Sequence, residues 1–281
     1  MTTAATVPRP AAKPAGKRMN IGSVTTAAKA LPSRTILHGH PGVGKTALGA
    51  HFPSPVFLMT TGETGLITLM QSKQIGPTNH FPEAAETWQD VFDAVMELQT
   101  AEHNHKTFIL DTLNGGERLN HEHVCRRDYG GDFGEKGFMG FQRGFVTALG
   151  DWRNLLCQLD KLRQERGMAI LLLCHTKTAS VRNPAGPDYD QFAPCLHKTT
   201  WEVTAGWADV ILYATQEVHV EAEKGKRGKG HAGRRVILTS GEAAYCAKNR
   251  HGLPEEIEMG ASGKEAYTNL MAAFQHGKAG E

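Results

Sequence analysis

An eight-residue glycine-rich segment constrains this chain more strongly than any other part of the sequence. Its residues are Gly39, His40, Pro41, Gly42, Val43, Gly44, Lys45 and Thr46. They fit the pattern G-x-x-x-x-G-K-[ST], in which glycine allows consecutive backbone N–H groups to point inward at a phosphate chain. The lysine of this pattern reaches the β- and γ-phosphates, and the hydroxyl that follows can ligate Mg²⁺. The segment therefore predicts a site for a nucleoside triphosphate and Mg²⁺.

The residues on either side of the glycine-rich segment support this prediction. Residues 34–38 form a short β-type run, and residues 46–51 read as a short helix that stops before Pro53. The N-terminal dipole of that helix adds to the attraction for phosphate. A strand, a glycine-rich loop and a helix in this order are the context that a phosphate-binding loop (P-loop) requires.

Length and composition indicate a globular protein without a membrane segment. The 281 residues are 40% hydrophobic and 21% charged, and they suffice for one large α/β domain or two small ones. No apolar run approaches the roughly 18 residues of a membrane span, and the basic N-terminus lacks the apolar core of a secretory signal. The five cysteines are scattered and odd in number, as expected of reduced thiols in a cytoplasmic protein.

Predicted strands and helices alternate along the chain. Apolar strands are expected at residues 34–38, 56–60, 107–112, 168–175 and 209–215, with edge strands at 236–239 and 244–247. Helices are expected at residues 82–100, 141–166 and, for a short stretch, within 264–281. Residues 114–140 and 176–200 read as long loops. This order predicts an α/β fold with a mainly parallel central sheet, helices on both faces and antiparallel edge strands.

The expected domain organisation has three parts. Residues 1–30 read as a disordered basic tail, residues 31–262 as the nucleotide-binding domain, and residues 263–281 as a helix with a flexible end. Residues 1–34 and residues 224–235 carry basic side chains and no acid. Such uneven charge favours contact with a polyanion, although a solvated tail and a hairpin tip give the same pattern.

Two carboxylates follow predicted strands at the edge where ligands of parallel sheets bind. Asp111 closes an apolar strand, the position from which a carboxylate holds Mg²⁺ in P-loop proteins. Glu63 lies in a tight turn between Gly62 and Gly65, where it could orient the water that attacks the γ-phosphate. Glu117 is the alternative for this role.

Three further residues are candidates for contact with phosphate. His175 ends a central strand and could pass the presence of the γ-phosphate to the loop that follows, or it could simply cap the strand. Lys248 and Arg250 alternate on an extended segment, so both side chains point the same way. They could reach a phosphate across a subunit interface, whereas the simpler reading is an exposed basic turn.

The two predicted loops interleave basic and aromatic residues. Cations suit the phosphates of single-stranded nucleic acid, and aromatic rings stack on its bases. The candidate DNA-binding residues are Arg126, Arg127, Tyr129, Phe133 and Lys136 in the first loop, with Lys177, Arg182 and Lys198 in the second. A mobile lid over the nucleotide is the alternative reading of both loops.

Together these motifs resemble the RecA-like ATPase core over about residues 33–260. The resemblance rests on the P-loop, Glu63, residues 108–111, residues 174–177 (Cys-His-Thr-Lys) and residues 247–252 (Ala-Lys-Asn-Arg-His-Gly). The last of these looks like the trans-acting finger of DnaB-type helicases and RecA-type recombinases. In size and motif order, the chain is most similar to small phage-encoded nucleotide-binding proteins, which include ATP-dependent single-strand annealing proteins.

The resemblance implies a role for each candidate residue. ATP would lie against residues 39–46 and Ala47, with Mg²⁺ on Thr46 and Asp111. Glu63 would be the catalytic carboxylate and His175 the γ-phosphate sensor. Lys248 and Arg250 would act on the ATP of a neighbouring subunit.

The resemblance also implies partners. They are single-stranded DNA, further copies of the chain in a filament or ring with nucleotide at the subunit interface, and a single-strand-binding protein. The implied activity is annealing or strand pairing. The sequence shows neither a separate N-terminal helicase domain nor the large C-terminal domain of recombinases, which disfavours unaided strand exchange and favours annealing, or mediation with a partner. The alternatives are a P-loop ATPase acting on a protein partner and a DnaB-like helicase core or loader.

Overall fold

The computed structural model describes residues 21–27, 30–221 and 229–279. Most of the expected basic tail, residues 1–20, and the cations at 224–227 lie outside the described residues, so the structure does not test those predictions. The chain divides into two units, Met1–Ala30 and Leu31–Glu281. In the first, the described residues form one 3₁₀ turn, η1 (Ile21–Ser23). The second unit carries all the elements that follow.

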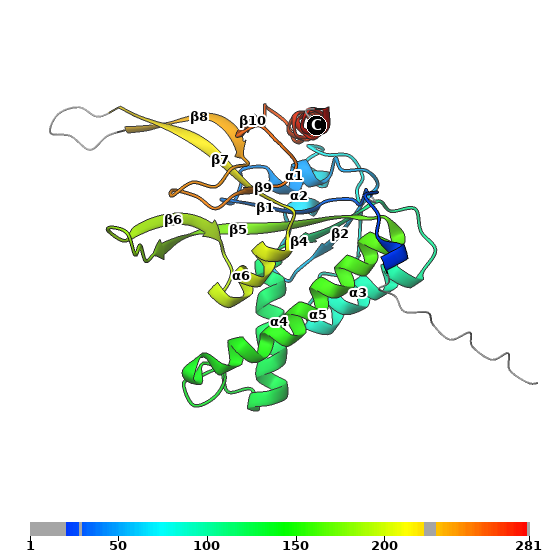
Figure 1. Ribbon diagram of the computed structural model, residues 1–281, viewed down its shortest axis with the longest axis vertical. Coiled ribbons are helices and arrows are strands. Elements are labelled where there is room, and N and C mark those ends of the chain that lie inside the picture. Colours follow the sequence, from blue (N-terminus) through cyan, green and yellow to red (C-terminus); the bar gives the residue numbers. More distant parts are fainter. Residues whose placement is uncertain (1–20, 28–29, 222–228, 280–281) are drawn as a thin grey trace, which may run out of the picture. The chain divides into compact units, whose positions relative to one another are not determined.

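A mixed sheet runs through the second unit (Figure 1). Its parallel strands are β1 (Arg34–Gly39), β2 (Pro55–Met59), β3 (Asn79–His80), β4 (Thr107–Asp111), β5 (Ala169–Val181) and β7 (Val210–Glu221). Its antiparallel additions are β6 (Tyr189–Pro194), β8 (Lys229–Leu238), β9 (Lys248–Asn249) and β10 (Glu256–Glu258). The order is β10-β8-β7-β1-β5-β4-β2-β3, with β6 on β5 and β9 on β7. The P-loop strand β1 is therefore central, between β5 and β7.

Helices cover both faces of the sheet (Figure 1). One face packs against α1 (Lys45–Gly49), α2 (Gly65–Gln71) and α7 (Gly263–Ala279). The other packs against α3 (Trp88–Thr100), α4 (Leu113–Tyr129), α5 (Arg143–Arg166) and α6 (Lys198–Trp207). Along β4, Phe108 and Leu110 point to the second face, whereas Ile109 points to the first. This two-sided burial explains the continuous apolar runs of the central strands, and it confirms the predicted α/β fold with a mainly parallel sheet and antiparallel edge strands.

Local signals set the ends of two helices. The helix predicted at 82–100 begins only at Trp88, because the Thr87 side chain accepts from the backbone N–H of Asp90 and the Asp90 side chain accepts from that of Thr87. Helix α5 ends at Arg166, as the sequence predicted, and its C-cap Gly167 has a φ of 65° in the left-handed region. No helix among the described residues is both long enough and apolar enough to cross a membrane.

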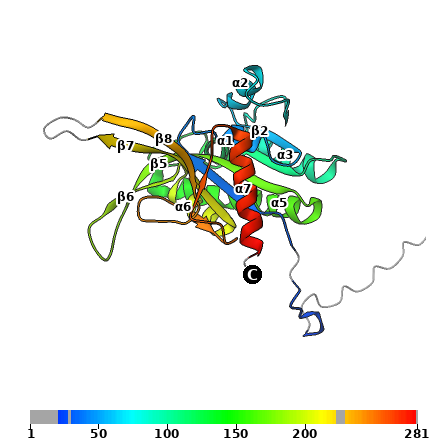
Figure 2. The ribbon, with the colours of Figure 1, turned by 90° about the horizontal axis from the view of Figure 1, so that it is seen from above.

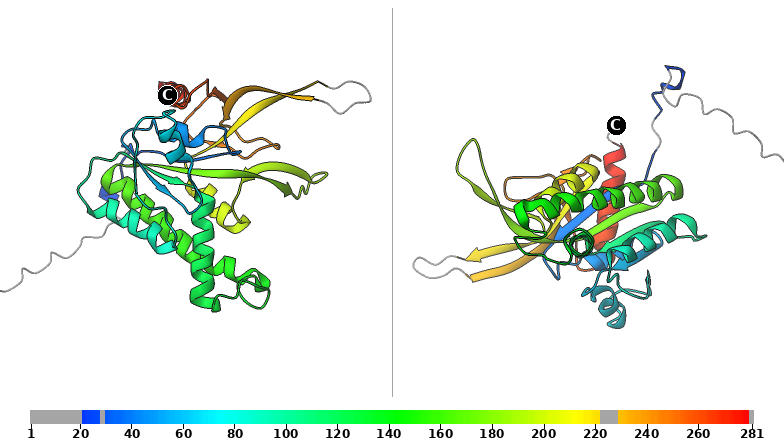
Figure 3. Two further views of the ribbon diagram at one scale, coloured as in Figure 1. Left: turned by 180° about the vertical axis from the view of Figure 1, so that it is seen from behind. Right: turned by 90° about the horizontal axis from the view of Figure 1, so that it is seen from below.

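The prediction of an irregular segment at 114–140 was wrong. Residues 113–129 form helix α4, with Thr112 as N-cap and Gly130 as a left-handed C-cap. The glycines that suggested a loop serve packing instead, since a Cβ on Gly115 would lie 2.0 Å from the Thr60 hydroxyl oxygen. Only the tip between α4 and α5 is irregular, including the short 3₁₀ turn η2 (Gly140–Gln142). Figure 3 shows this tip extending beyond the sheet.

The long loop predicted at 176–200 is also corrected. Strand β5 continues to Val181 and pairs with β6 in an antiparallel hairpin, after which α6 begins at Lys198. Residues 244–247 do not form the predicted edge strand, because Tyr245 makes only single bridges to Phe192 and Glu242. The β5–β6 and β7–β8 hairpins extend from the same side of the molecule, where the parallel strands end (Figures 1 and 3).

Candidate nucleotide-binding site

The P-loop joins the central strand β1 to helix α1. Gly42 and Gly44 have φ values of 81° and 109°, a region in which other residues are strained. Gly39 is required for a different reason, because a Cβ there would lie 2.4 Å from the carbonyl oxygen of Ala214 on β7. Loop curvature and strand packing thus both account for the glycines of the motif.

A cavity of about 580 Å³ opens beside this loop. The predicted residues that line it are Pro41, Gly42, Gly44, Lys45, Thr46, Ala47, Glu63, Asp111 and His175. These residues come from four segments and meet where the parallel strands end, as ligand sites in such sheets do. A second cavity, of about 570 Å³, lies beside α3 and is lined by none of the predicted site residues.

Thr46 and Asp111 form the candidate magnesium site. The Thr46 hydroxyl donates to Asp111 Oδ2 across 2.9 Å, and the Asp111 side chain is buried. Burial raises the pKa of Asp111 to about 6, and a bound cation would favour its charged form. Hydroxyl and carboxylate oxygens are ligands that Mg²⁺ accepts. Among the described residues, no group of three or more His, Cys, Asp or Glu side chains is arranged to hold a metal ion, so phosphate and water would have to supply the remaining Mg²⁺ ligands.

Lys45 is already positioned at the mouth of the loop. Its ammonium donates to the carbonyl oxygens of Gly39 at 2.8 Å and His40 at 3.0 Å. Burial lowers its pKa below the ordinary value for lysine. The loop therefore holds a largely buried cation beside the amides that would face a phosphate.

Glu63 and His175 are paired on the adjoining wall. His175 Nε2 lies 3.3 Å from Glu63 Oε1, and the Thr112 hydroxyl donates to the same oxygen at 3.1 Å. The hydrogen bond with His175 is the largest influence holding the pKa of Glu63 below its ordinary value. By contrast, Glu117 accepts from the backbone N–H of His197 and does not line the cavity. Geometry thus favours Glu63 over Glu117 as the residue near a reacting phosphate.

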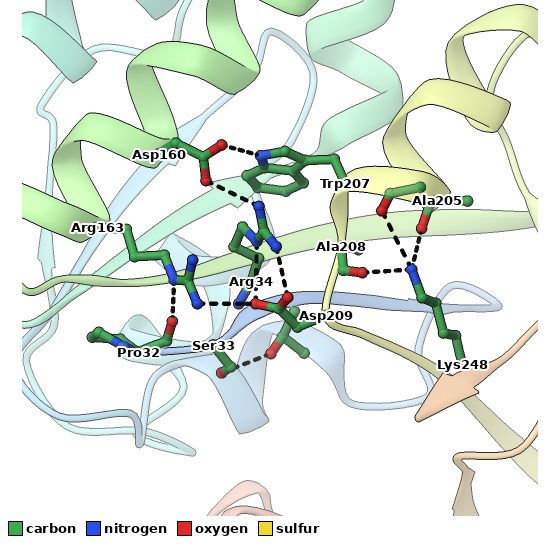
Figure 4. A network of polar contacts seen from close by, with 12 residues as sticks. Pro32, Ser33, Arg34, Asp160, Arg163, Ala205, Trp207, Ala208, Asp209 and Lys248 are labelled. Atoms are coloured by element: carbon green, nitrogen blue, oxygen red, sulfur yellow. Dashed lines mark hydrogen bonds and ion pairs between the residues drawn. The ribbon is translucent and has the colours of Figure 1, made fainter. Parts of the chain in front are cut away.

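The structure separates the two residues of the predicted finger. The Lys248 ammonium donates to the carbonyls of Ala205 and Ala208, at 2.6 and 2.7 Å, and so caps the end of α6 (Figure 4). Arg250 is exposed and makes no hydrogen bond or ion pair with any described residue. Lys248 is thus engaged by its own subunit, whereas Arg250 has no such partner in the part of the chain that the structure describes.

The candidate DNA-binding residues fall into two groups. Arg126, Arg127 and Tyr129 lie in the last turn of α4, and Phe133 and Lys136 lie in the tip that follows. Arg127 is engaged in ion pairs with Asp128 at 2.8 Å and Asp151 at 3.0 Å.

The second group, Lys177, Arg182 and Lys198, lines a single cavity of about 430 Å³ between the β5–β6 hairpin and α6. Trp201 lines the same cavity. The structure thus gathers three cations and an aromatic ring that the sequence places across 25 residues.

Sequence reasoning missed part of the nucleotide cavity. Arg235 on β8 and residues 261–263 before and at the start of α7 also line the cavity. In the sequence, Arg235 is only the last residue of the basic segment 224–235, and nothing local predicts that it lines the cavity. The pair Ser262 and Glu265, spaced as in a capping box, signalled that a helix begins here but not that it faces the P-loop.

The model of one protein family, described as an AAA domain, matches residues 31–251. The chain belongs to this family. The match covers the P-loop and the strands from β1 to β9, so the chain is a nucleotide-binding P-loop protein. A crystal structure of the RadB recombinase is similar to the chain, with 12% sequence identity and a TM-score of 0.44. The matched region covers 84% of this chain and 90% of the RadB chain. A similarity this distant does not indicate function. No curated protein matches the chain.

Proposed function

We propose that this AAA-domain protein hydrolyses ATP, binds single-stranded DNA and acts in homologous recombination of the phage type, by annealing or strand pairing. The observation that carries the proposal is the meeting of Lys45, Thr46, Asp111, Glu63 and His175 in one cavity. These residue types match the parts that phosphoryl transfer to water requires.

Each side chain has a distinct task in this reaction. Lys45 and the loop amides bind the phosphates, and Thr46 with Asp111 would hold Mg²⁺, which neutralises charge on the β- and γ-oxygens when bound. Glu63, ionised and oriented by Thr112, orients the attacking water and accepts its proton. His175 contacts Glu63 and lines the cavity in which the γ-phosphate would lie. It is therefore suited to report which nucleotide is bound.

The β5–β6 hairpin is the proposed DNA surface. One continuous strand, β5, carries His175 in the cavity and Lys177 two residues further on. Lys177, Arg182 and Lys198 would contact phosphates, and Trp201 offers a ring on which a base could stack. Nucleotide and DNA would therefore both contact residues of the protein strand β5.

Assembly with further copies is the second part of the proposal. Arg250 lies on an exposed bend and has no hydrogen bond or ion pair among the described residues. An arginine that reaches a neighbouring subunit stabilises charge on the transferred phosphoryl group. A filament or ring with nucleotide at the subunit interface would meet this need. A single-strand-binding protein that coats the same DNA is a natural further partner.

A protein client is the competing function, and the tip between α4 and α5 favours it. Phe141 is 93% exposed and Met139 is 45% exposed. Exposed apolar side chains on a projecting segment suit protein contact.

DNA binding decides between the two functions. We expect labelled single-stranded DNA to bind with an affinity that falls steeply with salt, and the double variant Arg182→Ala/Lys198→Ala to lower the log–log slope by about 1.4, or 0.7 per lost phosphate contact. Lys161→Ala, on the exposed face of α5, is the matched control and should leave the slope unchanged. A wild-type protein that fails to bind DNA would favour the protein client.

A further inference from the structure

The nucleotide cavity has a second half that the predicted residues do not fill. Lys45, Asp111 and Glu63 mark the end at which the γ-phosphate would lie. Arg235, the start of α7 and Gln74 also line the cavity. Arg235 comes from β8, which lies on the other side of the P-loop strand β1 from Asp111 on β4. Because the phosphate chain runs from the γ-phosphate toward the nucleoside, this second half faces the β- and α-phosphates and the nucleoside.

Arg235 is the basic residue of this second half. Its Nη2 donates to the carbonyl oxygen of Gly260 at 2.7 Å, and its Nη1 lies 3.5 Å from the carbonyl oxygen of Val43 in the P-loop. A Cβ on Gly44 would lie 3.2 Å from the same Nη1. The guanidinium therefore bridges the P-loop and the turn before α7, and it forms no ion pair with a carboxylate among the described residues.

The wall around Arg235 is fixed to the P-loop helix. A Cβ on Gly263 would lie 2.4 Å from the carbonyl oxygen of Ala47, so the start of α7 packs directly on α1 (Figure 2). Glu265 is the nearby acid, and its carboxylate is engaged by the backbone N–H of Ala261. This close packing holds Arg235 at a set distance from the loop amides.

We propose that Arg235 is a second phosphate-binding cation of this cavity, supplied by the same subunit and directed at the α- and β-phosphates. The inference rests on the proposed nucleotide site. These two phosphates are present in both ATP and ADP, so Arg235 binds substrate and product alike. An interaction of this uniform kind changes affinity and KM, and leaves kcat nearly unchanged. Arg250, in contrast, is proposed to act on the γ-phosphate of a neighbour and therefore on kcat.

The test separates the charge of Arg235 from its structural hydrogen bond. Arg235→Gln keeps an N–H donor for Gly260 and removes the charge, whereas Arg235→Lys keeps the charge. We expect Arg235→Gln to weaken ADP binding and to raise KM for ATP about 10-fold each, with kcat within about 2-fold of wild type. Arg235→Lys should recover most of the affinity.

Arg234→Gln is the matched control, because Arg234 precedes Arg235 on β8 but is exposed and paired with Glu217 and Glu256. It should bind ADP as wild type does. Wild-type ADP affinity in Arg235→Gln, or a fall in kcat alone, would overturn the proposal. Unchanged ADP affinity in both Arg235→Gln and Lys45→Ala would overturn the nucleotide site itself.

Discussion

Asp209 anchors the start of β7 to the P-loop strand, and its replacement by Asn should destabilise the fold. Its carboxylate accepts three hydrogen bonds from Arg34, the shortest 2.7 Å, and lies 3.3 Å from Arg163 Nη2 (Figure 4). Arg34 also pairs with Asp160, and its Cζ lies 5.2 Å from the centroid of the Trp207 ring. The network thereby ties β1, α5 and the end of α6 together at the end of β1 that is away from the P-loop.

The magnitude follows from the burial of these groups. The Asp209 and Arg34 side chains are only 14% and 18% exposed. Breaking one partner of a fully buried pair costs about 3–5 kcal/mol, and exposed pairs contribute about 0–1 kcal/mol. Asp209→Asn keeps the shape and one acceptor, so we expect it to lower the free energy of unfolding by about 2–3 kcal/mol at pH 7.

Urea unfolding at two pH values measures this effect. Burial alone would raise the pKa of Asp209, but the hydrogen bonds and charge of Arg34 outweigh it and hold the pKa below 3.8. The ionised carboxylate therefore stabilises the fold above that pH, and the difference between variant and wild type should shrink as the pH falls through the lowered pKa. Asp128→Asn, in an exposed pair with Arg127, is the control. Equal unfolding free energies for Asp209→Asn and wild type at pH 7 would refute the reasoning.

Three further predictions concern buried groups near the site. Asp111→Asn should stabilise the metal- and nucleotide-free protein by about 3 kcal/mol at pH 7.5, because a pKa raised from 3.8 to about 6 means that the charged carboxylate opposes folding. Urea unfolding measures this gain, which should vanish near pH 4. His38 is buried and its pKa is lowered to about 4, so the unfolded chain binds a proton at this histidine before the folded chain does as the pH falls below 6.5. The free energy of unfolding of the wild type should therefore fall by about 2 kcal/mol between pH 7 and pH 5, and His38→Gln should not show this loss. Gly115→Ala should cost about 1–3 kcal/mol, read from thermal or urea unfolding, because its Cβ meets Thr60; an unchanged stability would place α4 further from β2.

The nucleotide end of the site was predictable because its signals are local. The P-loop is a contiguous motif, and Glu63, Asp111 and His175 each follow an apolar run. The carboxyl ends of parallel strands meet at one edge of a sheet, so the positions of these residues followed from strand assignment alone. The fold class was predictable for the same reason, because the continuous apolar runs of the central strands are also a local signal.

The remainder depends on tertiary contacts that leave no local pattern. Gly115 reads as a loop residue, yet the close approach of Thr60 requires glycine inside a helix. Arg235 reaches the cavity only because β8 pairs with β7, which in turn pairs with β1. This pairing brings Arg235 beside the P-loop, which lies nearly 200 residues earlier in the chain. Lys248 is engaged because α6 ends beside β9, which composition cannot reveal.

The most direct test of the central claim is ATP hydrolysis measured with and without single-stranded DNA, for wild type and two variants. We predict that DNA stimulates hydrolysis by the wild type and that Lys45→Ala abolishes activity in both conditions. Arg250→Ala should lose the DNA-stimulated rate while it still binds nucleotide, since its proposed target is the phosphate of a neighbouring subunit. Hydrolysis that is indifferent to DNA and unaffected by Arg250→Ala would contradict the account and leave a P-loop ATPase with a protein client.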